Sequence, residues 1–111
     1  MNRIINTQNP AIYASHINAF NRMCTRRKVG ISAQLMMFKL LDLFACEGFR
    51  EWVSVENHAL MRAVGCTSET TVMSARSQLQ AMGLIEYKRG CKGRPGRYRL
   101  LGDPNTSEYV F

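Results

Sequence analysis

Six basic side chains within residues 88–99 have the clearest capacity for chemistry in this sequence. They are Lys88, Arg89, Lys92, Arg94, Arg97 and Arg99. Ammonium and guanidinium groups form charge-assisted hydrogen bonds with phosphate oxygens. No acidic residue interrupts the run, and Gly90, Gly93 and Gly96 allow tight turns and a close approach of the backbone to a ligand. The segment therefore predicts a surface that meets a polyanion.

The formal net charge of +7 for 111 residues is concentrated in two blocks. Residues 1–30 hold five basic residues and no acidic one, whereas residues 31–87 are slightly acidic. A scattered excess of basic residues would be explained by solubility alone. Two concentrated blocks instead favour a polyanionic partner that meets part of the surface.

The sequence contains no spacing of cysteines and histidines that is typical of a metal site or a redox-active pair. The candidate ligands are Cys24, Cys46, Cys66, Cys91, His16 and His58. The cysteines form no C-x-x-C pair, and neither histidine stands at metal-ligand spacing from them. We expect free thiols in a reducing compartment, with no metal and no cofactor.

We also expect no catalytic activity. Neither histidine belongs to a pattern with a partner carboxylate, and no phosphate-binding glycine loop precedes a helix. No apolar run is long enough to span a membrane, and the first ten residues lack the apolar core of a secretory signal. The expected location is therefore the cytoplasm, without membrane contact.

Two helices are predicted in the first half of the chain. Asn9 and Pro10 suit the start of a helix over residues 10–25. Ser32 is expected to cap a second helix, which is apolar on almost every side and should be buried on more than one face. Either the first helix packs over it, or a second copy of the chain covers it. The candidates for such an interface are Tyr13, Ile17, Phe20, Met36, Met37 and Leu40.

The second half of the chain predicts a helix, a tight turn, a helix and a hairpin. A short β-prone segment, residues 52–55, precedes a helix that starts near Ser54 or Glu56 and that Gly65 ends. Thr67 or Ser68 should cap the next helix. Its buried stripe is predicted from the spacing of Val72, Ala75, Leu79 and Met82.

Gly83 should end that helix, before strands over residues 84–88 and 97–101. The expected fold is mainly α with a small β-hairpin: a winged helix-turn-helix with an additional N-terminal helix. We expect residues 1–9 to be an N-terminal arm, residues 10–101 to be the winged-helix domain and residues 102–111 to be a C-terminal tail.

In such a fold the third helix of the winged-helix unit, here the helix that Thr67 or Ser68 caps, enters the major groove of DNA. The hairpin, or wing, meets the flanking backbone. The expected contacts of that helix are Ser68, Glu69, Thr70, Met73, Ser74 and Ser77. The expected wing and backbone contacts are Arg76 and the six basic residues of 88–99. No outward arginine or asparagine is placed for a bidentate contact to a base, so the sequence favours backbone binding over sequence readout.

Most of the chain, about residues 10–101, resembles the N-terminal winged-helix domain of DnaD-like replication-initiation proteins and phage replisome organisers. The resembling segments are the apolar helix 33–45, the run Trp52-Val-Ser-Val-Glu-Asn, Ala75-Arg76-x-x-Leu79, Gly83-Leu-Ile-Glu-Tyr87, and Tyr98-Arg-Leu100. The resemblance implies a phage or mobile-element protein that binds DNA, self-associates and helps to recruit helicase-loading or primosomal proteins. Members of this family usually carry a second, C-terminal domain beyond the resembling stretch.

Two other functions remain open at the level of sequence. A small transcriptional regulator would be a two-fold dimer with its third helices about one DNA turn apart on a palindromic site. A protein-interaction or oligomerisation module of a replication complex would have little direct contact with DNA. For the DNA-binding functions the expected partner is duplex DNA, with single-stranded DNA as the alternative.

Overall fold

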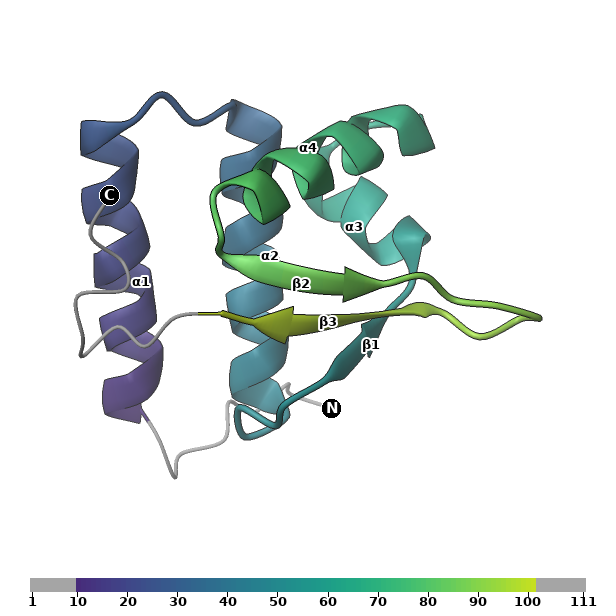
Figure 1. Cartoon of the computed structure of the whole chain (residues 1–111), viewed down its shortest axis with the longest axis horizontal. Helices are drawn as coiled ribbons and strands as arrows, with labels where there is room; N and C mark the ends of the chain where they lie inside the picture. The colour runs from purple at the N-terminus through teal and green to yellow at the C-terminus, as the bar shows by residue number, and fades with distance from the viewer. Residues whose placement is uncertain (1–9, 102–111) are drawn as a thin grey trace.

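Residues 10–101, which the computed structural model describes, form four helices and a three-stranded antiparallel sheet (Figure 1). The elements are α1 (Pro10–Arg26), α2 (Ile31–Cys46), β1 (Val53–Val55), α3 (Asn57–Val64), α4 (Glu69–Ala81), β2 (Ile85–Lys88) and β3 (Gly96–Leu100). This confirms the expected fold class, mainly α with a small sheet in the order of a winged helix. The expected arm, the Asn9 cap and the expected tail lie outside the described residues.

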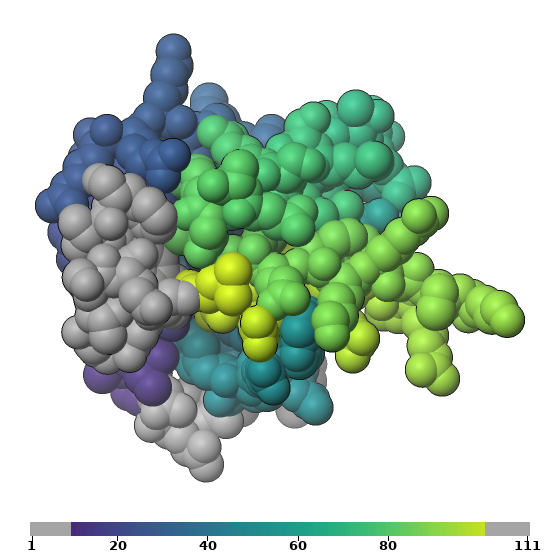
Figure 2. Space-filling view, viewed as in Figure 1, coloured from purple at the N-terminus to yellow at the C-terminus, as the bar shows by residue number. Residues whose placement is uncertain are grey.

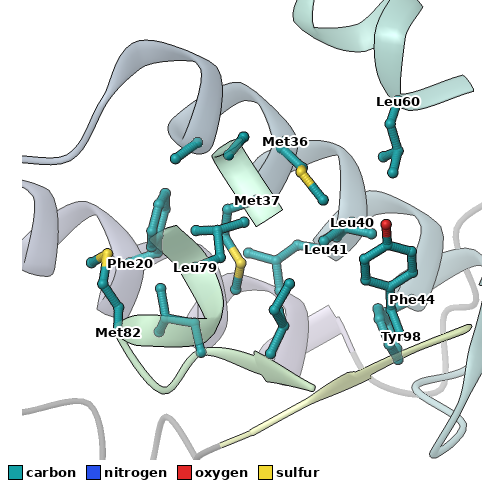
Figure 3. Packing of buried hydrophobic residues seen from close by; sticks show 14 of the residues in the cluster. Phe20, Met36, Met37, Leu40, Leu41, Phe44, Leu60, Leu79, Met82 and Tyr98 are labelled. Carbon is teal, nitrogen blue, oxygen red and sulfur yellow. The ribbon is translucent and has the colours of Figure 1, made fainter. Parts of the chain in front are cut away.

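The apolar helix α2 is the centre of the core. Met36, Met37, Leu40 and Leu41 have no exposed surface, and they pack with side chains from the other helices and the sheet (Figure 3). Helix α1 lies alongside α2 and contributes the buried Phe20 (Figure 1). Of the two ways to cover α2, the structure therefore shows packing by the first helix.

This packing corrects the predicted interface between copies of the chain. Phe20, Met36, Met37 and Leu40 are fully buried within a single chain, so they offer no surface to a second copy. The other two candidates, Tyr13 and Ile17, are half-buried and pack against the same core. The apolar periodicity correctly identified side chains that need cover, but the cover comes from the chain itself.

Ser32 does not cap α2, because the helix begins at Ile31, two residues earlier than expected. Gly30 is the N-cap and forms no side-chain cap bond. Gln34 Nε2 donates to the carbonyl of Val29 at 2.8 Å, and the Gly30 amide donates to Gln78 Oε1 at 3.3 Å. The start of α2 is thus fixed by a contact with α4, which no local sequence pattern reports.

The helix-turn-helix has the predicted punctuation. Gly65 ends α3 in the left-handed conformation with φ 70°, which glycine adopts without steric cost. Ser68 caps α4, and its hydroxyl accepts from the Thr70 amide at 3.1 Å. Val72 and Leu79 of the predicted stripe are fully buried, and Ala75 and Met82 are nearly so.

The hairpin gains a third strand. Strand β3 lies between β1 and β2, with Val53 opposite Tyr98 and Tyr87 opposite Tyr98 in the two registers. Because side chains alternate along a strand, Tyr98 points into the core while Arg97 and Arg99 lie on the outer face of the sheet. The loop of residues 89–95 projects beyond the sheet (Figure 1); this loop with β2 and β3 is the wing.

Membrane insertion of the described part would need a long apolar helix. None of the helices in residues 10–101 combines the length and hydrophobicity required to cross a bilayer.

Candidate nucleic-acid interface

Helix α4 presents a polar, uncharged outer face. The predicted contact residues on this exposed surface are Ser68, Thr70, Met73, Ser74 and Ser77. Met73 is 55% exposed, so its thioether and methyl group are accessible to a partner. Hydroxyl groups can bond phosphates or base edges, and a methionine methyl can contact the methyl of thymine. Thr70, Met73, Ser74 and Ser77 therefore share one accessible face of α4, and Ser68 is exposed at its N-terminal end.

Glu69, at the start of the same helix, is tied to α3. Its Oε2 accepts a hydrogen bond from Asn57 Nδ2 at 2.8 Å. Its negative charge is also favourable at the positive end of the helix dipole. The predicted role of Glu69 as an acceptor from cytosine would require this hydrogen bond to be shared or broken.

Arg76 is not a surface cation, which contradicts its predicted contact with the DNA backbone. It is 7% exposed, and its Nε donates to Tyr98 Oη at 2.9 Å. Its Nη2 donates to Asn57 Oδ1 at 2.8 Å, and its guanidinium lies 3.9 Å from the centre of the Tyr87 ring. Arg76 therefore joins α4 to α3 and to the base of the wing, and it fixes the helix relative to the hairpin.

Arg99 is also committed within the protein. Its guanidinium donates to Glu51 at 3.0 Å and to Glu86 at 2.5 Å, and Glu86 is its partner across the β2–β3 ladder. The hydrogen bond to Glu51, together with the charge of Glu86, raises the pKa of Arg99 above its already high value. With two carboxylates beside it, Arg99 adds little positive charge to the surface, so its predicted contact with a phosphate is not supported by the geometry.

The remaining wing cations form a different group. Lys88, Arg89, Lys92, Arg94 and Arg97 are all exposed. None of them forms an ion pair within residues 10–101. Lys88 and Arg97 stand directly opposite each other in the β2–β3 register, and a like-charge pair at such positions is unfavourable. An anion bound between or beside them would relieve that repulsion.

A hollow of about 320 Å³ at the base of the wing collects several of these groups. Its lining consists of Ser54, Arg89, Gly90, Cys91, Arg94, Pro95 and Arg97. Three arginines and a serine among the lining residues can supply the charge-assisted hydrogen bonds that a phosphate accepts. The wing thus carries positive charge both in its loop, at Lys92, and around this hollow.

Trp52 lies at the foot of this surface on the outer face of the sheet. Its ring centre is 4.5 Å from Lys88 Nζ and 5.6 Å from the Arg97 guanidinium. Such cation–π contacts restrain long side chains without neutralising their charge. The sequence pattern missed Trp52 and Asn57 as supporting residues because both act on partners far away in the chain.

No disulfide joins the four cysteines, all of which lie within residues 10–101. Cys24, Cys46 and Cys66 are half-buried, and burial raises the pKa of the Cys24 thiol. Cys91 is exposed on the wing. Within residues 10–101 no three acidic, histidine or cysteine side chains gather closely enough to hold a metal ion.

Comparison with known proteins adds little. No family model matches the sequence, so the resemblance to DnaD-like proteins has no support from that comparison, and no curated protein matches. A similar solved structure is described as "Structure of Rep-DNA complex". It shares 17% identity, with 95% of this chain and 74% of that chain covered, at a TM-score of 0.43. A likeness of this degree says nothing about function, which must be inferred from the geometry of α4 and the wing.

Proposed function

We propose that this protein binds duplex DNA, with α4 in the major groove and the wing on the phosphate backbone. One observation carries the proposal: five exposed wing cations, which have no ion-pair partner within residues 10–101, lie next to an exposed polar helix in a winged-helix arrangement. Unpaired cations at this density favour a polyanion, and the fold supplies a helix of the right size for the groove. The protein acts by binding, and the proposal assigns it no catalytic step.

The binding is mainly independent of base sequence. The outer face of α4 has no arginine, lysine or asparagine, and these side chains make most of the strong bidentate contacts to bases. Gln80, near the end of α4, is its one exposed amide side chain. This composition argues against a regulator that must find one palindromic site, and it suits a protein that needs DNA contact more than discrimination.

The biological setting that we propose is the start of DNA replication in a phage or mobile element. The support for this part is the sequence resemblance to replication-initiation proteins. Self-association and contact with helicase-loading or primosomal proteins belong to the same proposal. Ile31 and Leu35, which are 76% and 42% exposed on α2, are better candidates for such contacts than the buried residues. A mass of one chain in sedimentation equilibrium would contradict self-association.

Fluorescence anisotropy with random-sequence duplex DNA, titrated at several salt concentrations, tests the proposal. Each phosphate neutralised releases counterions, so the logarithm of affinity should fall with the logarithm of salt concentration with a slope of about −0.9 per contact. We expect a steep slope for the wild type. The wing variant, Lys92→Glu/Arg94→Glu, should bind at least about tenfold more weakly and with a flatter slope.

A control variant with the same change in net charge is Lys39→Glu/Arg50→Glu. Lys39 is on α2, and Arg50 is in the loop after α2, where it forms an exposed ion pair with Glu47 of little energetic value. The control should retain most of the wild-type affinity. Equal losses of affinity in both variants would show that the wing contributes only net charge. Absence of salt-dependent binding by the wild type would refute DNA binding and favour a protein-interaction module.

A further inference from the structure

We propose that the basic turn, defined as residues 26–30 from the end of α1 to the start of α2, is a second phosphate-binding surface on the side of α4 opposite the wing. This inference rests on the proposed DNA binding and adds a partner surface to it. The DNA backbone would then be held on both sides of the groove that α4 occupies.

The geometry of α4 places the turn and the wing on opposite sides. Arg76 faces the wing, because it bonds Tyr98, whereas Gln78 faces the turn, because it bonds the Gly30 amide. At about 100° per residue, these two positions are about 160° apart around the helix. Ser77 lies between them, on the exposed face. The two basic surfaces therefore flank the polar face of α4.

The polar face of α4 continues directly into the turn. A groove of about 400 Å³ lies between the two, and it is lined by α4 on one side and by residues 30–33 on the other. Its lining residues are Gly30, Ile31, Ser32, Ala33, Thr70, Thr71, Ser74, Ala75 and Gln78. A side chain at position 30 would place its Cβ 3.1 Å from Gln78 Oε1, so glycine permits the close approach there. Figure 2 shows α4 (green) between the blue surface that includes the turn and the yellow-green wing.

Two cations of the turn are free of ion pairs in the described part of the chain. Arg26 and Lys28 are exposed and form no ion pair within the described residues. The sequence contains no acidic residue before Asp42, so α1 and the turn supply no acidic partner of their own. Arg26, in the last turn of α1, is favourable there because of the helix dipole. Lys28 lies beyond the helix end, where that explanation does not apply.

The distances along the chain suit a phosphate contact beside α4. Lys28 is two residues from Gly30, a span of at most about 7 Å even when extended. The backbone of Lys28 therefore lies close to the groove shared with α4, within reach of a lysine side chain. A helix about 10–12 Å in diameter fills the major groove of similar width, so phosphates of the two strands pass along its two sides. One row would meet the wing and the other would meet the basic turn.

The test compares four forms of the full chain by the same anisotropy titration. They are the wild type, the turn variant Arg26→Glu/Lys28→Glu, the wing variant Lys92→Glu/Arg94→Glu, and the control Lys39→Glu/Arg50→Glu. We expect the turn variant to bind duplex DNA about tenfold or more weakly than the control, with a salt slope flatter by about 2. The losses of the turn and wing variants should add when the two are combined, because the two surfaces are far apart.

Duplex and single-stranded DNA give an independent readout. The inference requires two phosphate rows held at a fixed separation, so the turn variant should lose more affinity for duplex than for a single strand. If its affinity and slope match the control while the wing variant is impaired, the inference is wrong and the proposed function stands. If the wild type shows no salt-dependent binding, both fail.

The turn variant is not expected to unfold, since both side chains are exposed and unpaired within the described residues. Its thermal unfolding, followed by circular dichroism, should stay cooperative and lie only a few degrees below that of the wild type, because reversal of the Arg26 charge at the end of α1 costs about 1 kcal/mol. The milder variant Arg26→Gln/Lys28→Gln removes the charges without adding acidic groups. Its loss of affinity for duplex DNA, on a logarithmic scale, should be about half that of the turn variant. An affinity equal to that of the wild type would also overturn the inference.

Discussion

Arg76 and Tyr98 show how a charged side chain can become part of a protein core. Arg76 donates to the Tyr98 hydroxyl and to Asn57, and it stacks on Tyr87. The helical pattern correctly placed Arg76 at the border of the buried stripe. Its partners are 19 and 22 residues away for the two hydrogen bonds, so no local pattern could reveal that they would enclose it.

The same pair predicts a pH dependence of stability. Burial raises the pKa of Tyr98 to about 12 from an ordinary value of 10.0, and the nearby charge of Arg76 opposes the rise without cancelling it. The neutral phenol is therefore favoured in the folded state. Its contribution to stability is fully present below about pH 10, and it is lost as the pH rises from about 10 to about 12.

The measurement is chemical denaturation between pH 8 and pH 12, in wild type and Tyr98→Phe. We expect the unfolding free energy of the wild type to fall by about 2 kcal/mol over the upper part of this range through Tyr98 alone. Tyr98→Phe should be less stable than the wild type at pH 8, because Arg76 loses an acceptor, but its stability should fall less steeply. Tyr13→Phe is the control, and equal slopes for all three proteins would contradict the assignment.

At the scale of the elements, the ends of helices were predicted well wherever the signal is local. Gly65 and Ser68 end α3 and cap α4 as expected, since each acts on groups within a few residues of itself. The start of α2 was wrong because Gln78, 48 residues from Gly30, takes part in fixing it. The pairing of β1 with β3 was also not predicted, because strand partners are chosen by the whole fold.

The wing gives a prediction at this scale. A Cβ at position 90 would lie 2.0 Å from the carbonyl oxygen of Arg94, a backbone atom that cannot move without reshaping the loop. Gly90→Ala should therefore rearrange the loop of residues 89–95. We expect affinity for duplex DNA to fall by at least a few-fold, since Arg89 and Arg94 lose their common orientation, while the unfolding temperature changes little in an exposed loop.

Gly93→Ala is the matched comparison. Gly93 has φ 80°, but a Cβ there meets no atom within 4 Å, so the change brings backbone strain of about 1 kcal/mol without a collision. Its DNA affinity should stay closer to that of the wild type than that of Gly90→Ala. A larger loss of affinity in Gly93→Ala than in Gly90→Ala would show that the backbone conformation at Gly90 does not govern binding.

For the whole molecule, α1 shares one hydrophobic core with the winged helix. Phe20 of α1 has no exposed surface and meets Phe38 of α2 edge to face, with ring centres 5.2 Å apart. The sequence predicted that α2 needed cover on more than one face but left the source of that cover open. Amphipathic periodicity gives the direction of burial, and only the three-dimensional packing identifies the partner.

Phe20→Ala should accordingly destabilise the entire domain. Removal of a buried phenylalanine costs about 3–5 kcal/mol, a large share of the 5–15 kcal/mol typical of a domain. Hydrogen exchange should show the amides of α1 and α2 losing protection together, and Ile31→Ala, at an exposed position, should have little effect. Selective loss of protection in α1, with α2 and the wing unchanged, would show that α1 is a separate unit.

The position of Trp52 has a practical consequence, because it is the single tryptophan of the chain. Its indole lies beside Lys88 and Arg97 at the base of the wing, so its emission should respond when a phosphate draws those cations away. The basic turn precedes α2 and Trp52 follows it, and a helix of 16 residues, about 24 Å long, separates them. The protein thus contains its own optical sensor, which can report engagement of the wing separately from engagement of the turn without any label.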